Sequence, residues 1–255
     1  MKTTQKNYNI FFILNSPYFI FGKILIKSIY KNCNTENVRK IYILDTGLSE
    51  SEKKYLKSFD KVELLDSGLT TNFTNGSWSE DWHINIALKL KILKSIVEQI
   101  SEPILMIDGD CMVMKDLGEL LSFGGDIQLC YRGDTDPETP YLGSYVGILN
   151  TNGLLFIDDC ITDMENSANR YLEGKIWPKE SKAMSRVAMS YKKLNKLNIK
   201  DFSLSEVSEF SSDNIDNCHI VHFKGSTLSS TTEELIQSRI YNRGFGPYVS
   251  EYLDE

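Results

Sequence analysis

The first 110 residues alternate short apolar runs with segments of helical periodicity, and this alternation constrains the fold more than any other feature of the sequence. The runs are Ile10–Leu14, Lys40–Leu44, Val62–Leu65 and Ile104–Ile107. Runs this short and this continuously apolar are typical of strands buried on both faces of a parallel sheet. Strands that alternate with helices predict an α/β chain with a doubly wound, mainly parallel sheet.

Helical patterns lie between these runs. Residues 21–30 carry apolar side chains at helical spacing, and Ser49 begins a second helix with Glu52 at the spacing of a capping box. In Trp82–Ile100 apolar residues recur at steps of three and four, and Pro103 ends that segment. Each strand of the first half is therefore followed by a helix or a loop long enough to cross the sheet.

The second half of the chain has short apolar segments separated by Gly, Pro and Asn, which indicates a mixed sheet or an appended subdomain. We expect strands at residues 126–131, 145–149, 154–157 and 218–223, and helices at 183–197 and 232–241. A length of 255 residues allows one large domain or a domain with a subdomain.

Composition excludes several classes of protein. A net charge of −7 argues against a nucleic-acid partner, because binding to phosphate backbones needs clustered cations. The five cysteines are far apart in the sequence and show none of the paired spacings typical of metal sites. We therefore expect reduced thiols and a cytoplasmic location. The apolar stretch 8–21 contains Asn15 and Pro17 and falls short of the roughly 18 apolar residues of a spanning helix, so we expect no transmembrane segment.

Asp108 and Asp110 follow the last strand of the first half, with Gly109 between them. Two carboxylates this close resist joint ionisation unless a cation compensates them. Oxygen ligands suit Mg²⁺ or Mn²⁺, which often share their coordination with substrate phosphates. Gly109 would allow a ligand to approach closely. A surface turn of the Asp-Gly-Asp type is the alternative for the acidic pair.

The stretch 104–121 resembles the Asp-x-Asp region of the GT-A fold glycosyltransferases. This resemblance implies a Rossmann-like GT-A fold in which Asp108 and Asp110 hold the metal that bridges the diphosphate of a nucleotide-sugar donor. It also implies one GT-A domain, with a nucleotide-sugar-binding half at residues 1–125 and an acceptor-binding half with a C-terminal helix at 126–255.

His222-Phe223-Lys224-Gly225 resembles the His-x-x-Gly element of glycosyltransferase family 8, the group that includes glycogenin-like and bacterial galactosyltransferase-like enzymes. The resemblance implies that His222 is the third metal ligand and that Lys224 and Gly225 lie by the donor diphosphate. Here Ser226-Thr227-Leu228 replaces the family's Lys-Pro-Trp. His219 is three residues away on the same strand, so we expect it to point elsewhere.

Other donor-binding positions follow from the same resemblance. Asn15 and Ser16 end the first strand where such enzymes grip the nucleoside, and Asp45 ends the second strand. A basic residue on the helix before the Asp-x-Asp strand would meet the donor; Lys91 is the preferred match and Lys89 the alternative. Each of these also fits an ordinary turn or a solvated helix position.

On the acceptor side, Glu180 stands where family members carry an acidic or amide residue near the reacting carbon, as a general base or as a group that orients the sugar. We therefore expect a metal-dependent transferase that moves a sugar from a nucleoside diphosphate sugar to a glycan or other carbohydrate acceptor. The expected donor is a uridine diphosphate sugar. The alternatives are a haloacid dehalogenase-type phosphohydrolase, which also has Asp-x-Asp after a strand, and an inactive nucleotide-sugar-binding module. A nucleotidyltransferase is less favoured, because Asn-Ser-Pro-Tyr after the first strand is not a Gly-rich phosphate loop.

Overall fold

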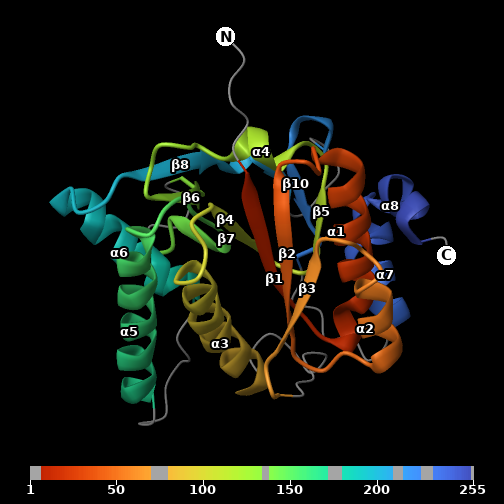
Figure 1. Cartoon of the computed structure of the whole chain (residues 1–255), viewed down its shortest axis with the longest axis horizontal. Coiled ribbons are helices and arrows are strands. Elements are labelled where there is room, and N and C mark those ends of the chain that lie inside the picture. Colours follow the sequence, from red (N-terminus) through yellow and green to blue (C-terminus); the bar gives the residue numbers. More distant parts are fainter. Residues whose placement is uncertain are drawn as a thin grey trace.

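The computed structural model describes residues 7–69, 80–133, 138–171, 180–208, 215–224 and 232–253. A seven-stranded sheet in the order β3-β2-β1-β4-β7-β6-β8 forms its centre (Figure 1). The strands are β1 (Tyr8–Leu14), β2 (Val38–Asp45), β3 (Val62–Asp66), β4 (Ile104–Ile107), β6 (Ile127–Tyr131), β7 (Tyr141–Ile148) and β8 (Ile199–Ser203). The first four are parallel, and β7 is antiparallel to both of its neighbours. The predicted mixed, mainly parallel sheet is confirmed.

Helices cover both faces of this sheet. They are α1 (Phe19–Asn32), α2 (Glu50–Leu56), α3 (Glu80–Val97), α4 (Leu117–Leu120), α5 (Gly153–Tyr171), α6 (Glu180–Leu194), α7 (Thr232–Arg239) and α8 (Gly246–Leu253). Residues of α3, α5 and α6 share one hydrophobic core, and those of α1 and α2 share another on the opposite face (Figure 1). Within the described ranges, no helix is long and apolar enough to cross a membrane.

The central strand β1 explains why the first apolar run has no polar face. Ile10, Phe12 and Leu14 pack in the core that contains α1, whereas Phe11 packs in the core that contains α3. All four side chains are essentially inaccessible to solvent. Burying each one contributes about 1.5–3 kcal/mol, so a polar substitution on either face of β1 would be costly.

A second, three-stranded sheet brings the C-terminal part of the chain to the end of β4. β5 (Cys111–Val113) follows the acidic pair and is antiparallel to β10 (Ile220–His222), which in turn pairs with β9 (Val207–Ser208). His222 lies opposite Cys111 in this pairing. The Phe223 N–H donates to the Asp110 carbonyl oxygen at 2.8 Å. This pairing therefore places His222 beside Asp110 although the two residues are far apart in the sequence.

Several predicted boundaries needed correction. Residues 154–157 were expected to form a strand, but they lie in α5. Four apolar residues fit both periodicities, and here Phe156, Ile157, Cys160 and Met164 continue the pattern at helical steps and are buried. The strand expected at 145–149 begins earlier, at Tyr141, and the helix expected at 183–197 runs from Glu180 to Leu194. The capping box of Ser49 and Glu52 is confirmed, and the five cysteines are buried and form no disulfide bonds.

Gly109 allows close backbone packing. A Cβ atom at this position would lie 2.4 Å from the carbonyl oxygen of Ile13 on β1. The missing side chain, which was expected to let a ligand approach, also lets the turn between β4 and β5 pack directly on the end of β1.

We predict that Gly109→Ala lowers the free energy of unfolding by about 3 kcal/mol, because the atom it meets is main chain and cannot rotate away. Gly68→Ala is the matched control: Gly68 has a φ of +67° and open space around it, so only the backbone strain of about 1 kcal/mol applies. Urea denaturation of both variants measures the difference. Equal losses would contradict the close packing described for Gly109.

Candidate metal and donor site

Asp108, Asp110 and His222 lie together at the carboxyl end of β4. One ligand atom from each of the three lies within 4.8 Å of the others. His222 Nε2 is 3.2 Å from Asp110 Oδ1 and 3.7 Å from Asp108 Oδ2. The histidine side chain is 4% exposed, whereas that of Asp108 is 27% exposed. Two carboxylate oxygens and one imidazole nitrogen facing a partly open space suit Mn²⁺ or Mg²⁺.

Lys89 from α3 joins this cluster to a third carboxylate. Its Nζ lies 3.1 Å from Asp108 Oδ1 and 3.0 Å from Glu180 Oε1, and its side chain is 4% exposed. Burial alone would lower the pKa of Lys89, but Asp108 and then Glu180 raise it above its usual value. The ammonium therefore remains charged and holds α3, the end of β4 and the start of α6 together.

The two acids beside Lys89 differ in their pKa values. Burial disfavours the ionised form of Asp108, yet Lys89 and then His222 hold its pKa below the usual range. Burial raises the pKa of Glu180 to about 7; Asp108 adds to this rise and Lys89 opposes it. One carboxyl group thus stays ionised while the other titrates near neutrality, a difference typical of acid–base sites.

Glu180 reaches the cluster because β7 carries a glycine opposite it. A Cβ at Gly143 would lie 2.8 Å from the Glu180 Cγ, and the Gly143 N–H donates to the Ser181 hydroxyl at 3.0 Å. The missing side chain at Gly143 therefore admits the first turn of α6.

Asp110 is held from the C-terminal side by Arg239 in α7. The Arg239 Nη1 donates to Asp110 Oδ2 at 3.0 Å, and its Nη2 donates to the Tyr18 hydroxyl at 2.9 Å. Arg239 is 3% exposed. Nothing local in the sequence links α7 to Asp110, since Arg239 and Asp110 lie 129 positions apart.

Lys91 does not reach the cluster, although the sequence analysis preferred it to Lys89. The Lys91 side chain is 53% exposed, and its Nζ pairs with Glu165 at 2.8 Å. Two residues span about 200° around a helix, so Lys89 and Lys91 occupy nearly opposite faces of α3. The signal that favours Lys89 in the sequence is its place near the apolar face of the helix, where a charged residue is unusual.

The loop residues expected near the nucleoside make contacts within their own turns or with the neighbouring turn. Asn15 is fully buried and its Oδ1 accepts from the Tyr18 N–H, while the Ser16 hydroxyl contacts the Gly47 carbonyl oxygen. Asp45 accepts from the N–H groups of Gly47 and Leu48, at 2.9 and 2.8 Å. The structure therefore shows Asp45 stabilising its turn rather than offering an uncommitted carboxylate to a ligand.

Asp45 is also fixed by a lysine. Its Oδ2 pairs with Lys53 Nζ at 3.0 Å. Burial alone would raise the pKa of Asp45, but these backbone hydrogen bonds and Lys53 hold it below the usual value. Lys224 lies two residues after the end of β10, and its carbonyl oxygen accepts a hydrogen bond from Arg243. Gly225, the last expected donor contact, lies outside the described residues.

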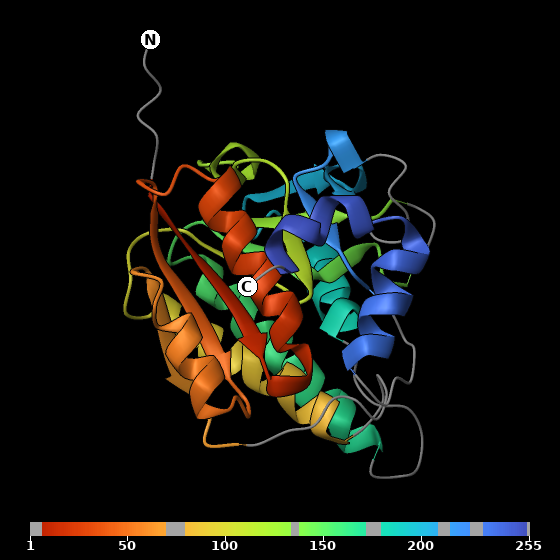
Figure 2. The same cartoon turned by 90° about the vertical axis from the view of Figure 1, so that its right-hand side faces the viewer.

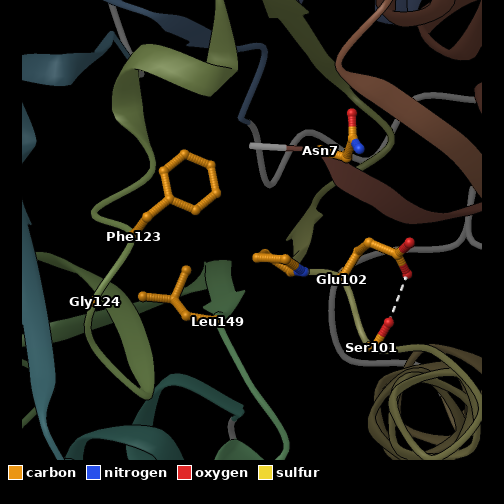
Figure 3. A pocket seen from close by; sticks show the side chains of 7 residues that line it. Asn7, Ser101, Glu102, Phe123, Gly124 and Leu149 are labelled. Carbon is orange, nitrogen blue, oxygen red and sulfur yellow. Dashed lines mark hydrogen bonds between the residues drawn. The ribbon is translucent and has the colours of Figure 1, made fainter. Parts of the chain in front are cut away.

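The opposite end of the sheet has a hollow of a different kind. It has a volume of about 470 Å³ and lies where β1 and β4 begin (Figure 3). Its lining includes one carboxylate, Glu102, which accepts a hydrogen bond from Ser101 at 3.4 Å, and no lysine, arginine or histidine among the residues that line it. The cluster of Asp108, Asp110 and His222 lies instead at the carboxyl end of β4, and open α/β sheets bind ligands at the carboxyl ends of their strands.

The chain resembles known proteins in its structure but not in its sequence. No family model and no curated protein sequence matches the chain. Among solved structures, the galactosyltransferase LgtC in complex with donor and acceptor sugar analogues matches with a TM-score of 0.55 at 12% identity, over 91% of this chain and 95% of that chain. The chain has the GT-A glycosyltransferase fold. An active-site mutant of LgtC matches equally well, with a TM-score of 0.55.

A second protein with the same fold is longer. The apo structure of the bifunctional glycosyltransferase WbbM matches with a TM-score of 0.59 at 12% identity and covers 99% of this chain. The match covers 53% of WbbM, so this chain spans about half the length of that protein. At this level of identity the likeness establishes the GT-A fold, which was predicted from residues 104–121.

We predict that Lys89→Met lowers the free energy of unfolding by about 3–5 kcal/mol, because it leaves Asp108 and Glu180 without their shared counter-ion in a buried position. The same substitution at Lys91 removes only an exposed pair and should change the stability by less than about 0.5 kcal/mol. Urea denaturation at pH 7 compares the two variants. Similar losses would show that Lys89 does not hold the two carboxylates together.

Glu180 should make stability depend on pH. Its pKa rises from 4.5 to about 7 on folding, so the unfolded chain releases this proton at lower pH than the folded one. A carboxyl group whose pKa is higher in the folded state stabilises the protein fully at pH values below its pKa in the unfolded chain. This stabilisation is lost as the pH rises to the pKa of the folded state. Relative to Glu180→Gln, the wild type should therefore lose about 3 kcal/mol of stability between pH 4.5 and 7.5. Denaturation of both proteins in metal-free buffer across this range measures the difference; a constant difference would contradict the shifted pKa.

Proposed function

We propose that the chain is a metal-dependent glycosyltransferase. It would transfer a sugar from a nucleoside diphosphate sugar, specifically a uridine diphosphate sugar, to a glycan or other acceptor. The observation that carries this proposal is the convergence of Asp108, Asp110 and His222 at the carboxyl end of β4. The GT-A fold around them supports it, because the acidic pair occupies the place implied by the Asp-x-Asp resemblance.

Asp108, Asp110 and His222 would hold Mn²⁺ or Mg²⁺. When bound, such an ion supplies positive charge to the diphosphate that leaves the sugar. Lys89 keeps Asp108 ionised and oriented for this role through its 3.1 Å contact. Lys224, two residues beyond His222, would add a further positive charge to stabilise the departing diphosphate.

Glu180 would act on the sugar side of the site. A carboxylate with a pKa of about 7 accepts a proton readily at neutral pH, so Glu180 suits a general base for the acceptor hydroxyl in an inverting reaction. In a retaining reaction the same side chain would orient the donor sugar. Lys89 holds Glu180 at 3.0 Å in both cases, so this contact does not distinguish the two roles. The stereochemistry of the product does, because a general base gives inversion and an orienting group accompanies retention.

The chain would divide its work between its two halves. Residues 1–125 supply β1 to β4 and the acidic pair, and we propose that they bind the donor, with the turns around Asn15, Ser16 and Asp45 bordering the nucleoside. Residues 126–255 supply Glu180, His222 and the C-terminal helices, and we assign the acceptor to this half. Five buried cysteines that form no disulfide bonds agree with action in the reducing cytoplasm.

The proposal predicts Mn²⁺-dependent release of a nucleoside diphosphate from one nucleotide sugar in a panel of UDP-, GDP-, ADP- and CDP-sugars. Asp110→Asn should reduce this release at least about 100-fold, because it removes one ligand charge and one ligand oxygen. Asp163→Asn is the matched control, since Asp163 pairs with Arg186 between α5 and α6 and belongs to neither the metal nor the donor cluster. Both variants should be checked for unchanged thermal unfolding before assay.

Two outcomes would contradict the proposal. Cleavage of a generic phosphate ester without binding of any nucleotide sugar would favour the phosphohydrolase. Binding of a nucleotide sugar without transfer or hydrolysis would favour an inactive binding module.

A further inference from the structure

The C-terminal helix α7 supplies a buried cation to the acidic pair. Arg239 lies in its last turn, and Figure 2 shows the C-terminal helices, in blue, beside α1. The guanidinium lies against the rings of Tyr18 and Phe21, with its carbon 5.2 and 5.9 Å from their centroids. Its Nη1 is 3.0 Å from Asp110 Oδ2. Arg239 is thus held by packing as well as by charge.

In each carboxylate of the pair, one oxygen contacts a lysine or arginine and the other oxygen lies towards His222. Asp110 directs Oδ2 to Arg239 and Oδ1 to His222 Nε2 at 3.2 Å. Asp108 directs Oδ1 to Lys89 and Oδ2 towards His222 Nε2 at 3.7 Å. One oxygen of each acid therefore contacts a fixed cation of the protein, and the other oxygen faces the imidazole, where a metal ion would be held.

This division limits the charge available to a free metal ion. Asp108, Asp110 and Glu180 carry at most three negative charges, and Lys89 and Arg239 carry two positive charges in direct contact with them. The net charge of these five groups is therefore no more negative than −1. A divalent cation binds weakly to so nearly neutral a set, unless a diphosphate adds its own negative charge and oxygen ligands.

We propose that Arg239 couples metal binding to binding of the nucleoside diphosphate. Arg239 offsets the negative charge of Asp110 and occupies its Oδ2, and this keeps the affinity of the metal site for a free divalent cation low. The site then holds the ion tightly only together with the diphosphate. Arg239 is a positioning residue in this account, since it acts through Asp110. The inference rests on the proposed metal site and goes beyond it, because it assigns a role to a C-terminal residue outside both sequence motifs.

Arg243 connects the same segment to the other side of the site. It lies in the short helix η5 (Tyr241–Arg243), and its Nη1 donates to the carbonyl oxygen of Lys224. The acidic pair is thus tied to the last residue of α7, and the chain just after β10 is tied to η5, which follows α7. A purely structural role for Arg239 predicts that neutral variants bind free Mn²⁺ with unchanged or lower affinity.

The experiment measures binding of Mn²⁺ by electron paramagnetic resonance, in which the signal of the free aqueous ion disappears on binding. Wild type, Arg239→Met and Arg239→Lys are titrated with Mn²⁺ alone and with Mn²⁺ plus UDP, GDP, CDP or ADP. Arg186→Met is the matched control, because Arg186 pairs with Asp163 away from the site. Arg239→Gln, which still donates hydrogen bonds, provides a second neutral variant if the methionine variant does not fold.

We expect the wild type to bind Mn²⁺ alone weakly and to bind it much more tightly with one nucleoside diphosphate. The neutral variants should bind Mn²⁺ alone at least about tenfold more tightly, with a correspondingly smaller enhancement by the nucleotide. Arg239→Lys keeps the charge and should resemble the wild type, as should Arg186→Met.

Two results would overturn the inference in distinguishable ways. If folded neutral variants bind free Mn²⁺ with unchanged or lower affinity, Arg239 has only a structural role, and the proposed metal site stands. If the wild type binds Mn²⁺ neither alone nor with any nucleotide, the proposed function fails and the coupling fails with it.

Discussion

Two carboxylates lie one residue apart at the end of a buried strand, and their mutual repulsion is the constraint on which the surrounding structure depends. Lys89 compensates Asp108, Arg239 compensates Asp110, and His222 faces both acids from β10. The compensating groups come from three separate elements, so the acidic pair ties the first half of the chain to its C-terminal helices. This arrangement brings two carboxylate oxygens and one imidazole nitrogen within 4.8 Å of one another.

The backbone makes this arrangement possible at two glycines. Gly109 lets the turn after β4 rest on the Ile13 carbonyl oxygen, and Gly143 lets the first turn of α6 approach β7 closely enough for Glu180 to meet Lys89. Packing therefore sets the positions of the charged groups before any ligand is bound. Such preorganisation reduces the cost of orienting catalytic groups during a reaction.

The parts of the site that follow from local sequence were predictable. A strand of four apolar residues ending in Asp108 and Asp110, and a second apolar strand ending in His222, can be recognised without knowledge of the fold. Arg239 could not be found in this way, because its contact with Asp110 spans 129 residues. The preference for Lys91 over Lys89 was wrong about which side chain reaches Asp108, since distance along the chain was given more weight than the face of the helix.

The central claim is that Asp108, Asp110 and His222 hold one divalent cation together with a nucleoside diphosphate. Crystals grown with Mn²⁺ and the nucleoside diphosphate that binds most tightly allow the ion to be located by its anomalous scattering. The account predicts a single strong anomalous peak among these three side chains, adjacent to the diphosphate. A diphosphate bound at the end of β4 with no anomalous peak there, or a peak at a different set of ligands, would contradict it.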